Sequence, residues 1–270
     1  MPELPEVETI RRGLEPLITH QFISDVDVRE WRLRWPVTRN LAGLLRDQQI
    51  LQLGRRAKYL LIKTSSGTLL VHLGMSGSLF YLPSVSPPTT HDHIDIGFRG
   101  GSCLRFNDPR RFGSIHFTAQ PKLHRLLTRL GPEPLGKDFS AEYLIHVSRS
   151  RRVSIKNHLM NGQIIAGLGN IYATEALFRA GIHPARPAGR ISAARFSRLV
   201  QVIREVLNEA IRSGGTTLKD FVGGDGRPGF FQQSLSVYGR SGDPCFTCRA
   251  PIKRIIQGQR ASYYCPRCQR

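Results

Sequence analysis

Four of the five cysteines lie near the end of the chain as two Cys-x-x-Cys pairs, Cys245 with Cys248 and Cys265 with Cys268. Sixteen residues separate the two pairs, a spacing that is typical of four-thiolate zinc sites. A closed set of four thiolates leaves no open coordination position, so we expect one structural Zn2+. A redox or disulfide set is the alternative. A tail of about 30 residues cannot build a core of its own, so zinc binding would supply much of its folding energy.

The first residues, MPELPEVET, carry a second set of groups that can do chemistry. In one interpretation, Glu3 and Glu6 are helix-capping acids, which suit the positive end of a helix. In the other, removal of Met1 exposes Pro2 as a free secondary amine, which can attack an aldehydic carbon and form an iminium. An α-amino group has a reference pKa of roughly 8, so part of it is unprotonated near neutral pH. The residues alone leave both interpretations open.

The charge of the chain points to a polyanionic partner. Lys and Arg number 39 against 20 acidic residues, a formal net charge of +19. A soluble enzyme that acts on small neutral metabolites gains nothing from so much positive charge, which repels itself. A nucleic-acid-binding protein uses that charge to attract phosphates. No apolar run of about 18 residues is present, which argues against a membrane span. The start lacks the basic and apolar regions of a secretory signal, so we expect a cytoplasmic protein.

Hydrophobic periodicity divides the chain into a β-rich part, a helical part and the cysteine tail. Apolar residues spaced by three and four predict helices over about 3–18 and over 193–212. Short strand-like runs fill the region from about 22 to 118. GPEPLG at 131–136 predicts a domain boundary, and VGGDGRPG at 222–229 is typical of a loop. We therefore expect domains at 1–131, 132–235 and 236–270.

Six segments, in order along the chain, resemble the formamidopyrimidine-DNA glycosylase family. They are PELPEVET, RRAKYLL (55–61), HLGMSGSL (72–79), NDPRRFG (107–113), GLGNIYATEALF (167–178) and QRASYYCPRCQ (259–269). The resemblance implies a multi-domain α+β protein. Its parts are an N-terminal β-sandwich with flanking helices, a helix–two-turn–helix domain and a C-terminal four-cysteine zinc-finger hairpin. It also implies excision of 8-oxoguanine and formamidopyrimidines from duplex DNA, followed by cleavage of the abasic strand.

The resemblance assigns catalytic roles to four residues. Pro2 is expected to attack C1′ of the damaged nucleotide, and Glu3 to move protons beside it. Lys58 is expected to be a cation near the lesion phosphates that is linked to β-elimination. Arg260 is linked to δ-elimination, although a guanidinium is a poor acid and is better suited to anchor a phosphate. Without the resemblance, Lys58 would be a solvated charge in a basic strand.

Further residues are expected to contact DNA. The expected backbone-binding residues are His91, Arg110, Arg151, Lys156 and Asn170. Met75, Arg110 and Phe112 are expected to fill the space left by the flipped base, with Arg110 facing the orphaned base. Two alternatives remain at this stage: Met75 and Phe112 are ordinary core residues, or His91, Asp92 and His93 form part of a metal site. The loop 216–231 occupies the place of a lesion-capping loop, and no base-contacting residue is assigned to it.

Two competing functions follow from the same residues. A non-enzymatic zinc-finger DNA-binding protein would share the charge and the cysteines, and only Pro2, Glu3 and Lys58 argue for chemistry. An oxidised-pyrimidine glycosylase of the endonuclease VIII-like branch would share the Pro-Glu start. The expected partner is damaged double-stranded DNA, bound by a monomer without a small-molecule cofactor. We expect the protein to associate with the nucleoid when it is on DNA.

Overall fold

The computed structural model describes residues 1–215 and 235–270. Two compact units make up this part of the chain. The N-terminal unit comprises Met1–Thr128 with residues 213–215, and the second unit comprises Arg129–Arg212 with residues 235–270. The expected lesion-capping loop, 216–231, lies wholly outside the described residues. The domain boundaries at 131 and 235 stay predictions.

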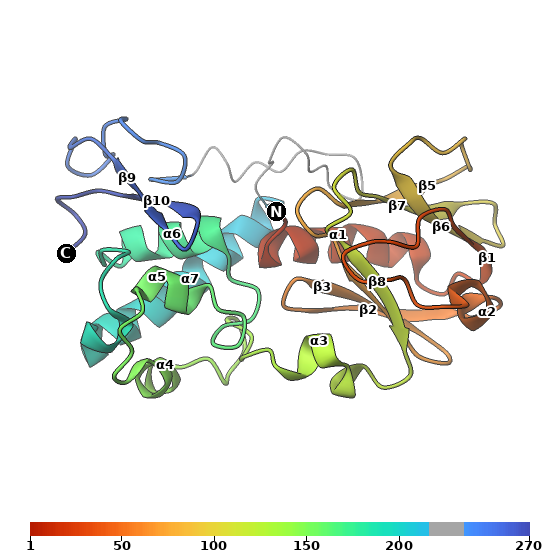
Figure 1. The fold of residues 1–270 in the computed structure, drawn as a ribbon, viewed down its shortest axis with the longest axis horizontal. Helices are drawn as coiled ribbons and strands as arrows, with labels where there is room; N and C mark the ends of the chain where they lie inside the picture. The colour runs from red at the N-terminus through yellow and green to blue at the C-terminus, as the bar shows by residue number, and fades with distance from the viewer. Residues whose placement is uncertain (216–234) are drawn as a thin grey trace. The chain divides into compact units, whose positions relative to one another are not determined.

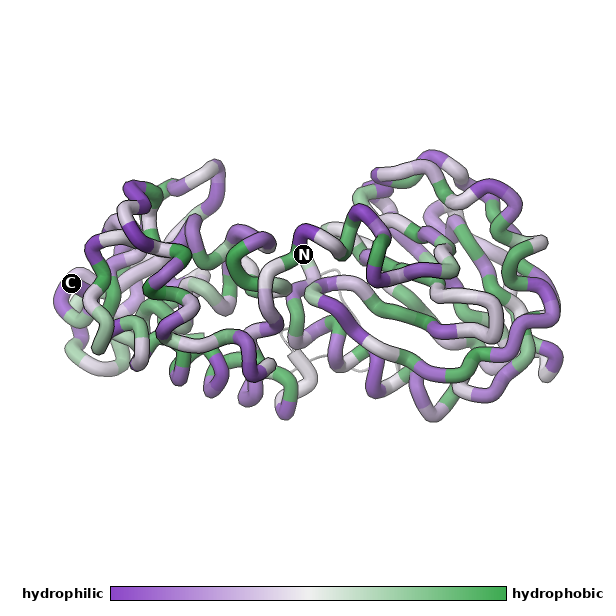
Figure 2. Tube along the Cα trace, turned by 90° about the horizontal axis from the view of Figure 1, so that it is seen from below, coloured by the Kyte–Doolittle hydropathy of each residue, from purple (hydrophilic) through white to green (hydrophobic). Residues whose placement is uncertain are grey.

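The N-terminal unit is a β-sandwich of two antiparallel sheets (Figure 1). One sheet has the order β1-β6-β7-β5 and the other β2-β3-β4-β8. The strands are β1 (Ile23–Val28), β2 (Ile50–Arg56), β3 (Tyr59–Thr64), β4 (Thr68–His72), β5 (Ser78–Leu82), β6 (Asp92–Phe98), β7 (Cys103–Asn107) and β8 (Ser114–Thr118). Along the Cα trace of this unit, green hydrophobic and purple hydrophilic segments alternate (Figure 2). The β-rich part predicted from the short strand-like runs is therefore confirmed, and it forms the β-sandwich that the resemblance implies.

Two helices cover the edges of this sandwich. α1 (Leu4–Ile18) packs against the edge strands β2 and β5 and also against β3, and α2 (Leu41–Leu45) packs against β1. Val7, Ile10 and Leu14 recur at helical spacing on α1 and are buried in the core that both sheets share. Covering an edge strand hides backbone groups that would otherwise pair with another chain. The unit also contains η1 (Pro121–Leu123) and α3 (Arg125–Thr128).

The second unit is helical and ends in a two-stranded hairpin. Its elements are α4 (Ala141–Ser148), α5 (Ile155–Leu159), α6 (Asn170–Arg179), η2 (Ala188–Arg190), α7 (Ala193–Arg212), β9 (Lys253–Gln257) and β10 (Arg260–Tyr264). The apolar stripe of α7 packs against α4 and α6, which confirms the helix predicted over 193–212. Among the residues with described coordinates, no helix combines the length and apolar character needed to cross a membrane.

Two departures from the predicted elements have simple causes. The predicted strands did not include β2, because its end, Gly54-Arg55-Arg56, lacks the apolar alternation of a half-buried strand. Lys58 does not lie in a strand but in the two-residue turn between β2 and β3, where Ala57 has a positive φ of 54°. The turn places Lys58 at the tip of a hairpin.

The buried histidine His116 on β8 makes stability depend on pH. Burial, with the nearby His124 and Arg125, lowers the pKa of His116 to about 4. The unfolded chain binds this proton below its ordinary pKa of 6.5, and the folded chain binds it only below about pH 4. The contribution of His116 is complete above pH 6.5 and is lost as the pH falls to 4.

We expect His116→Leu to flatten the decline of unfolding free energy between pH 6.5 and 4 by roughly 1–3 kcal/mol. Urea titrations across this window measure the effect. His146→Leu, which alters an exposed histidine of α4, is the control. Equal slopes in wild type and His116→Leu would contradict the assignment.

Candidate active site and nucleic-acid interface

The beginning of α1 is built around two buried carboxylates. Glu3 is the N-cap residue of α1, and its backbone N–H donates to Glu6 Oε2 at 2.8 Å. The two residues form a reciprocal capping box, which fixes the start of the helix. Pro2, Glu3 and Glu6 are all buried. Both interpretations of the first residues stay open, because Glu3 caps the helix and directly follows Pro2 in the chain.

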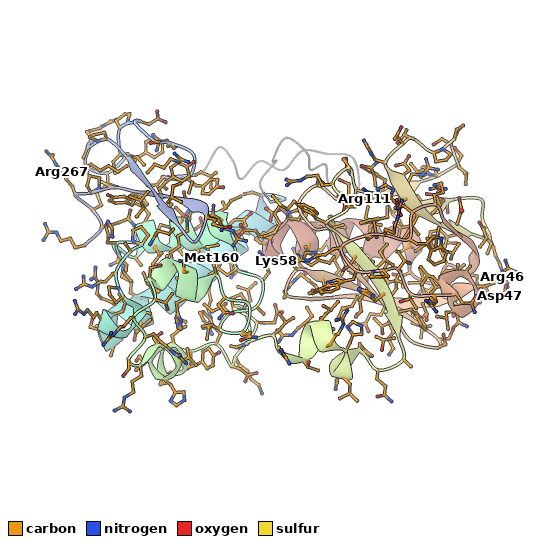
Figure 3. All side chains as sticks on the ribbon, viewed as in Figure 1. Arg46, Asp47, Lys58, Arg111, Met160 and Arg267 are labelled. Atoms are coloured by element: carbon orange, nitrogen blue, oxygen red, sulfur yellow. The ribbon has the colours of Figure 1, made fainter. Side chains whose placement is uncertain are left out.

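Lys58 is held at the end of the N-terminal unit where α1 begins (Figures 1 and 3). Arg55 of β2 links the hairpin to α1, because its Nε lies 3.3 Å from Glu8 Oε2 and its Nη1 donates to the Ala57 carbonyl at 2.9 Å. Burial alone would raise the pKa of Glu8, but hydrogen bonds from Arg11 and Arg12 and the charge of Arg55 lower it. The ionised Glu8 thus anchors the turn that carries Lys58.

His72 is a neighbour of Lys58 that the sequence analysis did not identify. Its ring lies 4.8 Å from the ring of Tyr59, and its Nδ1 accepts the Gly74 N–H at 3.0 Å. Burial, together with the charges of Lys58 and Arg34, lowers the pKa of His72 to about 4. The imidazole is therefore neutral at physiological pH. Its position two residues before Gly74 in the HLGMSG segment was the only signal available in the sequence.

The three residues expected to enter the duplex are exposed on two loops of the N-terminal unit. Met75 is 41% exposed and Phe112 is 42% exposed, so neither is a core residue. Arg110 is also exposed, and its guanidinium carbon lies 4.7 Å from the centre of the Phe112 ring. Exposed large hydrophobic side chains beside an arginine are chemically suited to stacking against bases.

His91 is exposed beside the same loops, whereas its two neighbours are engaged in the fold. Asp92 accepts hydrogen bonds from Thr89 and Asn107, and His93 Nε2 lies 2.8 Å from the Asp108 carbonyl. Both residues are buried. In the described part of the chain the only group able to hold a metal is the four cysteines, so His91, Asp92 and His93 do not form a metal site.

In the second unit, Asn170 is the first residue of α6 and therefore lies where helix N–H groups favour an anion. Its Nδ2 donates to Tyr238 Oη at 3.3 Å, and its Oδ1 is buried without a hydrogen-bond partner among the described residues. Tyr238, which sequence reasoning missed, is fixed by Glu175. The Glu175 carboxylate accepts the backbone N–H groups of Ser236, Val237 and Tyr238 at 2.8–3.0 Å.

Arg151 and Arg260 are exposed on turns of this unit. Arg151 lies between α4 and α5, and Arg260 is the first residue of β10. Gly258 and Gln259 form the β9–β10 turn with φ values of 52° and 61°. Two consecutive positive φ angles are typical of a type I′ hairpin turn, which projects the flanking Arg260 at the tip.

The expectation that Lys156 contacts DNA is corrected by the structure. The side chain is 0% exposed, and its Nζ donates to the Ala261 carbonyl at 2.8 Å and to Ser262 Oγ at 2.7 Å. A buried ammonium must be hydrogen-bonded, and here both bonds reach the zinc hairpin next to Arg260. Lys156 therefore joins α5 to β10 within the second unit. The surrounding charge run, Arg149, Arg151 and Arg152, had suggested a surface position.

The four sulfur atoms of Cys245, Cys248, Cys265 and Cys268 lie within 4.8 Å of one another. Cys245 Sγ is 3.9 Å from Cys268 Sγ, and Cys248 Sγ is 3.4 Å from Cys265 Sγ. A tetrahedral zinc with bonds of about 2.3 Å places its sulfur ligands about 3.8 Å apart. The cluster thus fits one structural Zn2+. The apolar core around it consists of Val237, Ala250, Ile252 and the cysteines Cys245 and Cys265.

Comparison with protein-family models accounts for nearly the whole chain. Residues 1–115 match the formamidopyrimidine-DNA glycosylase N-terminal domain, and residues 130–222 match its H2TH domain. Residues 242–270 match the zinc finger found in FPG and IleRS. The chain belongs to the formamidopyrimidine-DNA glycosylase family. Membership makes it a bifunctional DNA glycosylase and lyase, and it confirms the three-part architecture.

Individual relatives agree along their full length. The chain is 56% identical to formamidopyrimidine-DNA glycosylase of Thioalkalivibrio sulfidiphilus and 55% identical to that of Stutzerimonas stutzeri, with 100% of both chains covered in each case. A Lactococcus lactis Fpg variant, solved in complex with DNA containing Fapy-dG, superposes with a TM-score of 0.92 at 33% identity over 100% of both chains. MutM from Thermus thermophilus gives 0.88 at 39% identity, covering 99% of this chain and 98% of its own.

We expect metal analysis to find about one zinc per chain and Cys248→Ser to lose both zinc and DNA affinity. Cys103→Ser alters a buried cysteine of the N-terminal unit and should retain both. A Cys248→Ser protein that binds DNA normally without zinc would refute a role of the finger in DNA binding.

Lys156→Met should weaken DNA binding by disturbing the hairpin, while the salt dependence of binding keeps its slope. Loss of a phosphate contact would instead reduce the slope of log K against log[salt] by about 0.9. Lys137→Met removes an equal charge from an exposed position and is the control. Binding titrations at several salt concentrations distinguish these outcomes, and a reduced slope would restore the phosphate-contact interpretation.

Proposed function

We propose that this protein excises 8-oxoguanine and formamidopyrimidines from duplex DNA and then cleaves the abasic strand by β,δ-elimination. The observation that carries the proposal is the buried carboxyl of Glu3 at the fixed start of α1, directly after Pro2. Solved Lactococcus lactis Fpg proteins bind DNA containing Fapy-dG or an abasic site, which supports the same substrate class here.

Pro2 acts as the nucleophile after removal of Met1. Its secondary amine attacks C1′ of the damaged nucleotide, the glycosidic bond breaks, and the oxidised base leaves with a proton. The carboxyl of Glu3 donates a proton to O4′, which opens the sugar ring and leaves an iminium between the Pro2 nitrogen and C1′. Glu3 directly follows Pro2, and the capping box fixes it at the start of α1.

The iminium then acts as an electron sink for strand cleavage. Loss of a proton from C2′ breaks the C3′–O bond, and a second elimination breaks the C5′–O bond. Hydrolysis of the iminium returns the free amine. Lys58, at the tip of the β2–β3 turn, stabilises the negative charge of the departing phosphates. The neutral His72 beside it adds no competing positive charge.

Residues of both units bind the DNA backbone. Arg260 holds a phosphate through its guanidinium fork rather than acting as an acid. Asn170 presents its amide and the N-terminus of α6 to a second phosphate. Arg151 and His91, both exposed, add further backbone contacts. These contacts fix the register of the protein on the duplex but carry no sequence information.

Met75, Arg110 and Phe112 replace the extruded base within the stack. Unstacking a base costs a few kcal/mol, and filling the empty space offsets part of this cost. Arg110 faces the orphaned base, where its donors can read the base edge. The protein acts as a monomer in the cytoplasm and associates with the nucleoid when it is bound to DNA.

Borohydride treatment of the protein with a duplex containing a single 8-oxoguanine should yield a covalent adduct on the peptide that begins at Pro2. Reduction converts the iminium into a stable amine, and intact mass should show that Met1 is missing. Lys58→Met is the matched control, because it removes the other candidate amine and should still give the adduct. An adduct that maps to Lys58, or no adduct in the wild-type protein, would refute the assigned nucleophile.

A further inference from the structure

The two loops that carry Met75, Arg110 and Phe112 touch each other through their backbones. Gly74 has a φ of +67°, and a Cβ atom built on it would lie 2.3 Å from the Phe112 carbonyl carbon and 2.5 Å from the Gly113 nitrogen. No side chain fits in this contact. The loop between β4 and β5 therefore rests directly on the loop between β7 and β8.

A single carboxylate joins the same two loops. Asp108 is 0% exposed. Its Oδ1 accepts from Ser76 Oγ at 2.8 Å and from the Arg110 N–H at 3.3 Å, and its Oδ2 accepts from the Gly113 N–H at 2.7 Å. Ser76 Oγ also accepts the Arg110 N–H at 3.3 Å. Hydrogen bonds to a buried ionised group are among the stronger ones in proteins.

The backbone of Asp108 extends this arrangement on both sides. Its carbonyl accepts the Arg111 N–H at 3.1 Å and contacts His93 Nε2, while its own N–H donates to the His91 carbonyl at 3.0 Å. Arg111, labelled in Figure 3, has a φ of +55° and pairs with Glu30 at 2.9 Å. A positive φ at a residue other than glycine persists only where its surroundings hold it. The loop is thus fixed from several directions.

The side chains at the tip are also arranged in advance. The Arg110 guanidinium lies over the Phe112 ring at 4.7 Å, so these two residues stack in the protein without DNA. Binding groups that are already ordered avoid the entropy loss of ordering them on association. Such an arrangement would favour insertion of the ordered side chains into the base stack over a path in which each loop becomes ordered against the DNA separately.

We propose that Asp108, with Ser76 as its partner across the two loops, is the positioning residue that holds Met75, Arg110 and Phe112 as one preformed wedge. This inference rests on the proposed function, in which these three side chains fill the space of the extruded base. Because Asp108 and Ser76 are buried, we assign them no contact with the substrate or the reacting atoms. They act on the glycosylase step through the geometry of the wedge.

The test compares Ser76→Ala with Ser78→Ala in the full-length protein. Ser76→Ala removes the hydroxyl that bridges the loops, whereas Ser78 is an equally buried serine two residues away on β5. Asp108→Asn is the stronger variant, since an amide places a donor where two N–H groups and a hydroxyl need acceptors. Because Asp108→Asn can fail to fold, the result for Ser76→Ala decides the test.

Three measurements distinguish a role of Ser76 in positioning the wedge from a general effect on the structure of the protein. They are single-turnover excision of 8-oxoguanine with each base opposite, fluorescence of 2-aminopurine placed opposite the lesion, and strand cleavage at a preformed abasic site. We expect Ser76→Ala to slow excision about tenfold, equivalent to about 1.4 kcal/mol. It should also weaken the 2-aminopurine response and the discrimination by the opposite base. Abasic-site cleavage should stay within about twofold, and Ser78→Ala should match wild type.

The outcomes distinguish this inference from the function on which it rests. Normal excision and fluorescence in Ser76→Ala, together with loss of excision in Arg110→Ala and Phe112→Ala, would overturn the positioning role and leave the insertion residues in place. Equal loss of excision and abasic-site cleavage in Ser76→Ala would make the contact a general structural one and overturn the proposal. Failure of the wild-type protein to excise 8-oxoguanine would overturn both the proposed function and the wedge.

Discussion

Buried carboxylates that accept backbone N–H groups hold the functional segments of this protein in place. Glu6 accepts the N–H of Glu3 at the start of α1, Asp108 accepts those of Arg110 and Gly113, and Glu175 accepts three successive N–H groups that end at Tyr238. Each carboxylate is almost completely buried. A polar group in such a place needs its hydrogen bonds, because losing them would leave it buried and unsatisfied. The segments around these carboxylates are therefore tightly constrained.

This use of acidic residues also determines where positive charge remains available. Glu8 is shared by three arginines, Arg11, Arg12 and Arg55, and the buried Arg105 is neutralised by Asp95. Acids engaged in the interior cannot offset cations on the surface. The exposed Arg110, Arg151 and Arg260 thus keep their charges toward solvent, as a phosphate-binding protein requires. The net charge of +19 is the sum that results from this distribution of charges.

Sequence patterns predicted the features that depend on neighbours along the chain. Helical spacing located α1 and α7, and the Cys-x-x-Cys pairs located the zinc site. Features that depend on distant partners were missed. Asp108 meets Ser76 from 32 residues away, and Lys156 meets Ala261 from 105 residues away. No local sequence pattern distinguishes a lysine whose ammonium group is solvated from one whose ammonium group is buried against a carbonyl. The role expected for Lys156 was wrong for that reason.

If Met75 and Phe112 fill the space of the extruded base, as we propose, base extrusion explains why their backbones are anchored while their side chains project. The space left by a flipped base has a fixed shape, and unstacking already costs a few kcal/mol. A side chain on an unordered loop would add the cost of ordering that loop. Met75 and Phe112 project from backbones that are locked to each other at Gly74 and Gly113. Phosphates vary more in position along a deformable duplex, and in the phosphate contact that we propose for Arg260 the adaptable part is the long arginine side chain at the β9–β10 turn. In this proposal, rigid support at the base stack and adaptable reach at the DNA backbone are complementary parts of recognition.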